Sequence, residues 1–157
     1  MKKQQILDKL EQAWGEFTES YAGLTDEQMQ QPGVMEDWSV RDLMAHISWW
    51  EEEALKHLPT ILAGRRPPRY SVTYGGIDAF NARMTEQRST LALEEARRRL
   101  VETHARLLEY IRTIPEEQFT TETRFRRRLR LDTYSHYPVH TEAILAWREG
   151  LPASSQP

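Results

Sequence analysis

The chain contains no cysteine. It therefore has no disulfide, no thiolate nucleophile and no thiolate ligand for a metal ion. Glycine is also scarce, with 7 residues among 157, while leucine, alanine, glutamate and arginine are abundant. This composition favours helices over strands. The length fits one domain with a substantial core.

Several classes of protein are disfavoured by further absences. No apolar run approaches the roughly 18 residues that span a bilayer. The N-terminal segment MKKQQILDKLEQ becomes polar too early for a secretory signal, so the cytoplasm is the expected location. The net charge is only −3, so we expect neither a membrane nor a nucleic acid as partner. The sequence has no G-x-S-x-G, Walker or G-x-G-x-x-G motif.

Apolar residues at spacings of three and four predict amphipathic helices. The first covers Lys3–Tyr21. The second covers Val40–Leu62, with Ser39 as its N-cap and Asp42 completing a capping box. The segment GRRPPRY must end the second helix, because one glycine and two prolines occur together there.

A long connection follows, reaching about Ser89, with a short helix expected near DAFNARMTEQ. Thr90 is the expected cap of a third long helix, and the last helix is expected over Leu131–Glu149. Two strands within FTTETRFRRRLRL remain an alternative for that segment. The predicted fold is all-α: a four-helix bundle with a long connection between helices 2 and 3. It forms one domain, residues 1–150, followed by a flexible tail, residues 151–157.

Three histidines are candidates for a metal site. In the segment YSHYPVH, His136 and His140 are four residues apart and share the inner face of the last helix. His46 borders the inner face of the second helix. Together they would form an open three-histidine site. Their phase alone leaves an alternative, in which each ring binds a neighbouring carbonyl. His104 is equally well phased without a partner at ligand spacing, and His57 is expected on the surface.

Two segments carry a resemblance to a known family. DWSVRDLMAHISWWEEEAL and DTYSHYPVHTEAILAW resemble the second-helix and last-helix signatures of the DinB-like (YfiT-like) superfamily, and the nearest relatives are expected in its ClbS/DfsB branch. The resemblance implies His46, His136 and His140 as ligands of a divalent transition metal, zinc or nickel. It also implies a hydrolase or a thiol-dependent transferase, or alternatively a metal-free binding or protection protein for small molecules.

Pro138, between the two histidines, allows two backbone paths. Either the last helix begins near Tyr137 with the proline in its first turn, or a continuous helix from Leu131 is kinked at the proline. We expect the kink, because the last helix of the family begins well before its histidine pair.

The remaining site residues are predicted with less specific signals. The glutamates 51–53 are expected on a solvated face, with Glu53 as a weaker candidate for a general base. The arginines of residues 124–130 are expected either in a solvated loop or as an anion clamp at a pocket mouth. We expect a small-molecule substrate, and a homodimer remains open without a residue-level reason. The residues expected to bind the substrate are Trp50, Tyr134, Tyr137 and Arg128.

Overall fold

A computed structural model describes residues 1–152, and these residues form helices and no strand. The expectation of an all-α fold is confirmed. The predicted flexible tail, residues 151–157, falls for the most part outside the described residues. The helices are α1 (Lys3–Ser20), α2 (Asp26–Met29), α3 (Val40–Leu62), α4 (Tyr70–Thr73), α5 (Ile77–Gln87), α6 (Leu93–Arg112), α7 (Glu117–Thr120), α8 (Arg124–Asp132) and α9 (Tyr137–Glu149).

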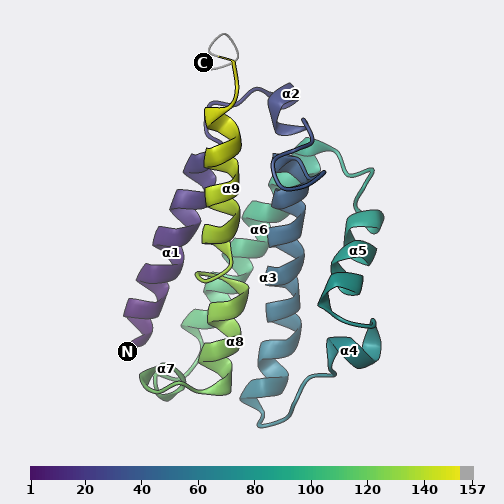
Figure 1. Ribbon diagram of the computed structural model, residues 1–157. Coiled ribbons are helices and arrows are strands. Elements are labelled where there is room, and N and C mark those ends of the chain that lie inside the picture. Colours follow the sequence, from purple (N-terminus) through teal and green to yellow (C-terminus); the bar gives the residue numbers. More distant parts are fainter. Residues whose placement is uncertain (153–157) are drawn as a thin grey trace.

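The long helices lie side by side, and α8 and α9 follow one another along the same direction (Figure 1). Helix α3 contacts α6, α8 and α5, while α1 contacts α9. The apolar stripes predicted from the sequence face one another in this arrangement, and side chains such as Leu10, Leu43, Leu107 and Ile144 are fully buried between the helices. No helix in the part described is long and apolar enough to cross a membrane.

Helix α3, which carries His46, begins as predicted. The Ser39 hydroxyl accepts a hydrogen bond from the Asp42 amide at 3.2 Å, and the Asp42 carboxylate accepts one from the Ser39 amide at 2.9 Å. This reciprocal pair satisfies two amides that have no partner within the helix. The cap fixes where the first turn of α3 starts and therefore which residues of α3 face inward.

The expected kinked helix over Leu131–Glu149 is wrong. Helix α8 ends at Asp132, and the backbone of Thr133 (φ −129°, ψ −101°) leaves the helical region. Helix α9 starts at Tyr137, so Pro138 lies in its first turn. A proline costs little there, because the first amides of a helix have no partner inside the helix. The main-chain carbonyl of Thr133 joins the two helices by accepting hydrogen bonds from the amides of His136 and Tyr137.

The alternative of two strands within residues 119–131 is also wrong. Thr123 caps α8 by accepting a hydrogen bond from the Arg126 amide at 3.1 Å. Phe125 and Leu129, four residues apart, are buried on the inner face of α8. The arginine-rich segment is therefore an amphipathic helix rather than a loop.

Candidate metal centre

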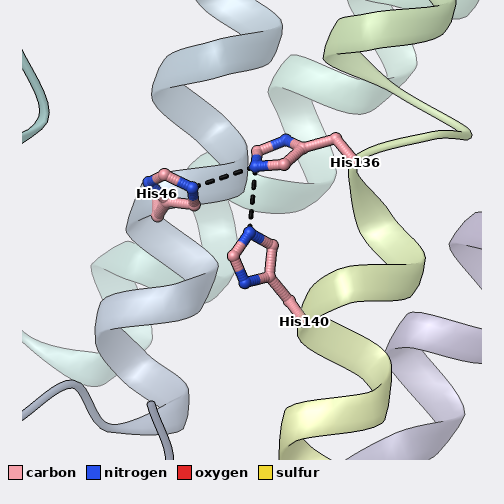
Figure 2. Close-up of side chains that lie close together, drawn as sticks. All are labelled: His46, His136 and His140. Carbon is pink, nitrogen blue, oxygen red and sulfur yellow. Dashed lines mark hydrogen bonds between the residues drawn. The ribbon is translucent and has the colours of Figure 1, made fainter. Parts of the chain in front are cut away.

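Three histidine side chains meet between α3 and the start of α9. His46 projects from α3, His136 stands at the N-cap of α9, and His140 lies in the first turns of α9; all three rings point toward one another (Figure 2). The Nε2 atom of His136 lies 3.0 Å from that of His46 and 2.9 Å from that of His140. The break before α9 achieves this, because it places His136 at the helix start and leaves its ring free to turn toward His140.

The three rings are held in the neutral form. His46 and His140 are each only 4% exposed. Burial, followed by the nearby His136 and His140, lowers the pKa of His46 to about 2. Burial and His136 lower the pKa of His140 to about 3, and burial lowers that of His136 to about 4. Neutral imidazoles at pH 7 have the lone pair that a metal ion requires.

The arrangement of the nitrogens fits a divalent transition metal. The His136 Nε2 atom faces two other Nε2 atoms, but a neutral ring nitrogen can act only as donor or as acceptor, so one contact is always poorly satisfied. An ion would take the lone pairs of all three. Nitrogens around a tetrahedral zinc ion lie roughly 3.3 Å apart. The two separations from His136 Nε2 are close to this value, and the three ligand atoms all lie within 4.8 Å of one another. The three Nδ1 atoms are buried and have no hydrogen-bond partner in the described residues.

A cavity of about 490 Å³ opens beside this cluster. It reaches His46 and His136 and is otherwise bounded by side chains of α3, α4, α5 and α8. The other lining residues are Trp50, Tyr70, Ile77, Asn81, Arg128, Leu131 and Asp132. A mostly apolar cavity with few polar groups next to a candidate metal centre is typical of a site for a small molecule.

A chain of hydrogen bonds crosses the wall of the cavity. The Arg128 Nε atom donates to Asp132 Oδ2 at 2.6 Å, and Arg128 Nη2 donates to the Tyr70 hydroxyl at 2.9 Å. The Tyr70 hydroxyl in turn donates to Glu53 Oε1 at 2.9 Å. Burial raises the pKa of Asp132 to about 6, although Arg128 opposes this change. The network holds one guanidinium group in a fixed orientation at the cavity.

The structure brings some of the expected substrate-binding residues to the cavity and not others. Trp50 and Arg128 line it. Tyr134 is not among the lining residues, and Tyr137 is fully buried, with its ring 5.6 Å from that of Trp14 in the core. Burial raises the pKa of Tyr137 well above its usual value.

Sequence reasoning missed three polar lining residues: Tyr70, Asn81 and Asp132. Asn81 lies within the segment DAFNARMTEQ, where a short helix was expected, and its Oδ1 accepts hydrogen bonds from the indoles of Trp49 (3.2 Å) and Trp50 (2.9 Å). Tyr70 belongs to a short helix without a periodic pattern, and Asp132 was expected at the start of the last helix, Leu131–Glu149. The sequence therefore predicted helices at Asn81 and Asp132 but no role for these two side chains.

The expectation that glutamates 51–53 form a solvated face is wrong for two of them. Glu51 is 0% exposed and Glu53 is 8% exposed. Glu53 does not line the cavity; its carboxylate accepts the Tyr70 hydrogen bond and lies 3.4 Å from His57 Nε2. His57, expected on the surface, is itself buried beside it.

His104 binds two glutamate carboxylates away from the three-histidine cluster. Its Nδ1 atom lies 2.9 Å from Glu51 Oε2 and its Nε2 atom lies 2.7 Å from Glu11 Oε1. The ring stacks on Trp14 with 3.6 Å between centroids. The two ring nitrogens point to carboxylates in different directions, so His104 is not part of the three-histidine cluster.

Comparison with known proteins identifies the family. The family model described as the DinB superfamily matches residues 9–142. The chain belongs to the DinB superfamily. This membership confirms the resemblance drawn from the two histidine-bearing segments. No curated protein sequence matches the chain.

Solved structures share the fold of this DinB superfamily member. DfsB, described as a sibling lethal factor precursor, is 16% identical, with a TM-score of 0.77 and 95% of this chain and 96% of that chain covered. A protein from Streptococcus pneumoniae is 14% identical, with a TM-score of 0.79 and 97% and 93% covered. The colibactin self-resistance protein ClbS, in complex with dsDNA, is 14% identical, with a TM-score of 0.78 and 96% and 98% covered. The expected similarity to ClbS and DfsB is confirmed at the level of the fold.

The exclusion of nucleic acid as a partner was wrong. It depended on the small negative net charge of the whole chain, but a protein with this fold, ClbS, has been crystallised in complex with dsDNA. A net charge averages over the surface and does not describe any one part of it.

Proposed function

We propose that the protein is a metal-dependent enzyme acting on a small molecule, with zinc or nickel bound by His46, His136 and His140. The observation that carries this proposal is the convergence of three histidines beside a cavity: the Nε2 atom of His136 lies 3.0 Å from that of His46 and 2.9 Å from that of His140, and the three ligand atoms all lie within 4.8 Å of one another. An ion with three protein ligands keeps a coordination position open for water or substrate.

The reaction we propose is hydrolysis or the transfer of a thiol. A zinc or nickel ion at this position would lower the pKa of a bound water or thiol and so supply a nucleophile near neutral pH. The proposal also assigns roles to side chains around the cavity. Trp50 and Leu131 exclude water from one side of the substrate, Arg128 orients it, and the buried histidines stay unprotonated and available as ligands.

The direct test is the metal content of protein purified without a histidine tag, loaded with zinc or nickel and then dialysed. We expect about one equivalent of metal per chain. Less than a tenth of an equivalent would contradict the proposal and favour the alternative, a metal-free protein that binds or sequesters a small molecule in the same cavity. The two reactions are then separated by following ester hydrolysis and the loss of free thiol in the presence of an electrophile.

A second candidate function, the binding of duplex DNA, is favoured by a separate observation. Among the exposed arginines that have no ion-pair partner in the part of the chain described, five lie on α8 and on the segment after α3, and we call these five the basic edge: Arg65, Arg66, Arg69, Arg124 and Arg127. Arg124 Nη1 donates to the Arg65 carbonyl at 3.4 Å, which connects α8 to the segment after α3. Both segments lie at the same end of the molecule (Figure 1). Arginines of this kind contact phosphates without reading the base sequence.

The salt dependence of binding tests this candidate. Fluorescence anisotropy with a labelled duplex should give an affinity whose logarithm falls with the logarithm of salt concentration, by roughly 0.9 for each phosphate neutralised. The triple variant Arg65→Gln/Arg66→Gln/Arg124→Gln should reduce that slope by about two to three units. Arg106→Gln, an exposed arginine of α6, serves as the control. Equal slopes for the triple variant and the control would exclude the basic edge as the DNA surface.

A further inference from the structure

The cavity wall contains one guanidinium group, that of Arg128, and only some of its hydrogen-bond donors have an acceptor in the protein. Arg128 Nε is bound to Asp132 and Nη2 to Tyr70, and the guanidinium lies 5.7 Å from the centre of the Tyr70 ring. Its third nitrogen, Nη1, has no hydrogen-bond partner among the described residues, although Arg128 lines the cavity. One donor nitrogen of a permanently charged group, Nη1 with its two N–H groups, is therefore available to a ligand.

The polarity of the surrounding hydrogen bonds keeps that donor available. The Tyr70 hydroxyl donates to Glu53 and so must accept from Arg128. Asp132 accepts from a second nitrogen of the guanidinium, Nε. Two neighbours thus fix the plane of the group while leaving Nη1 free. A planar group fixed in this way loses little conformational freedom on binding an oxyanion.

The rest of the cavity is apolar around this cation. Trp50 forms part of the inner wall, and Ile77 and Leu131 stand at the opening, where they are 54% and 52% exposed. The side-chain oxygen of Asn81, Oδ1, already accepts hydrogen bonds from two indole N–H groups. A ligand here would therefore meet the Arg128–Asp132 ion pair, the Tyr70 hydroxyl, the neutral imidazoles of His46 and His136, and apolar side chains.

We propose that the cavity selects a small organic acid, with its carboxylate on Arg128 Nη1 and its apolar body against Trp50, Ile77 and Leu131. Arg128 is the specificity-determining residue, and Tyr70 and Asp132 are positioning residues. The proposal deepens the proposed function, because the reacting group of such an acid would lie toward His46 and His136. Recognition of the acid by Arg128 does not itself require a metal ion.

The test compares two probes of matched shape, 4-phenylbutyrate and 4-phenylbutanamide, by calorimetric titration. Protein treated with a chelator is used first, so that the carboxylate cannot coordinate an ion. We expect the acid to bind at least tenfold more tightly than the amide, a difference of about 1.4 kcal/mol. Arg128→Met should remove that preference, and Arg106→Met should preserve it. Equal binding of the two probes by the chelated wild-type protein would overturn the proposal.

Two further variants keep the test decisive if Arg128→Met does not fold. The double variant Arg128→Met/Asp132→Asn removes both charges, so no unpaired buried ion remains, and it should also lose the preference for the acid. Asp132→Asn alone keeps the guanidinium and an oxygen that can accept from Nε and hold its plane, but removes the competing anion, so the acid should bind at least as tightly as to wild type. Weaker binding of the acid by Asp132→Asn than by wild type, or a preference retained by the double variant, would overturn the assignment to Arg128.

Zinc-loaded protein separates this proposal from the proposed function. If the chelated protein prefers the acid and the zinc-loaded protein retains no metal, the result supports the Arg128 site and contradicts the proposal of a metal-dependent enzyme. A preference that arises only after zinc is added and survives Arg128→Met would show direct coordination of the carboxylate, and so contradict the role of Arg128.

Discussion

The buried ion pair of His104 and Glu51 shows how single residues tie together helices α1, α3 and α6. Burial alone would lower the pKa of His104, but hydrogen bonds to Glu51 and Glu11 outweigh burial and raise it. Both ring nitrogens face carboxylates, which favours the protonated imidazolium stacked on Trp14, while burial raises the pKa of the Glu51 carboxyl. A buried charge of this kind is costly when its partner is removed.

We expect Glu51→Ala to lower the free energy of unfolding by about 3–5 kcal/mol, because it leaves the imidazolium buried with only Glu11 beside it. The double variant Glu51→Leu/His104→Leu should be nearer to wild type, since it removes both charges. Urea denaturation measures both. Arg98→Ala, which removes two exposed ion pairs on α6, with Glu95 and Glu102, should leave the unfolding midpoint nearly unchanged. Equal losses for the single and double variants would show that the pair is not charged.

The three neutral histidines make the metal-free protein sensitive to acid. Their pKa values of about 2, 3 and 4 lie below the 6.5 of an unfolded chain. Between pH 6.5 and 4 the unfolded state binds more protons, so stability falls as the pH falls, by about 1.4 kcal/mol per pH unit for each histidine. Asp132, whose pKa burial raises to about 6, takes up a proton in the folded state and offsets roughly one histidine.

A variant isolates this effect from other titrating groups. His140→Asn, measured by urea denaturation in the presence of a chelator between pH 4.5 and 6.5, should show a shallower loss of stability, by about 1.4 kcal/mol per pH unit. A slope identical to that of wild type would mean that His140 is protonated in the folded protein.

At the scale of the element, the short break between α8 and α9 determines how the site is built. Thr133 leaves the helical conformation, its hydroxyl donates to the Leu129 carbonyl at 2.6 Å, and its own carbonyl accepts from the first residues of the next segment. The break sets His136 at the N-cap of α9, from where its ring reaches His140. A continuous helix would instead have placed the two rings one turn apart on one face.

We expect Pro138→Ala to change little. The proline lies in the first turn of α9, where an amide has no partner inside the helix, so the free energy of unfolding should change by less than about 0.5 kcal/mol. Metal affinity should stay within twofold. Pro59 is the matched comparison, because it lies inside α3; Pro59→Ala should stabilise the protein by roughly 1–3 kcal/mol. A clear gain for Pro138→Ala together with weaker metal binding would indicate a strained turn between the histidines.

The sequence predicted the elements whose apolar spacing is strong and failed where spacing is ambiguous. Helices α1, α3 and α6 have long apolar stripes and the cap at Ser39 depends on local chemistry, so these features were predicted. The expected cap of α6 at Thr90 was wrong, because α6 begins at Leu93 with Ala92 as its N-cap. The break before α9 was not, because Pro138 is compatible both with a kink and with a helix start. Burial of Glu51 was missed because its partner, His104, is 53 residues away and no local pattern reports on it.

At the scale of the molecule, the candidate site depends on packing between distant segments. His46 is 90 residues from His136, and phase along each helix indicated the inner face for both. The position of a residue around its own helix could not show that the rings meet. It also could not show that Tyr70 of α4 and Asn81 of α5 line the cavity. Those contacts depend on how the long connection between α3 and α6 packs against α3. The sequence of that connection has no regular apolar spacing from which this packing could be predicted.

The metal content of five single variants, each loaded with zinc and dialysed under identical conditions, tests the central claim most directly. His46→Ala, His136→Ala and His140→Ala each remove one of three converging ligands, so each should fall from about one equivalent to less than a tenth. His57→Ala and His104→Ala should retain about one equivalent, because their rings face Glu53, and Glu51 with Glu11, respectively. Loss of metal from His104→Ala with retention in His136→Ala would contradict the three-histidine centre.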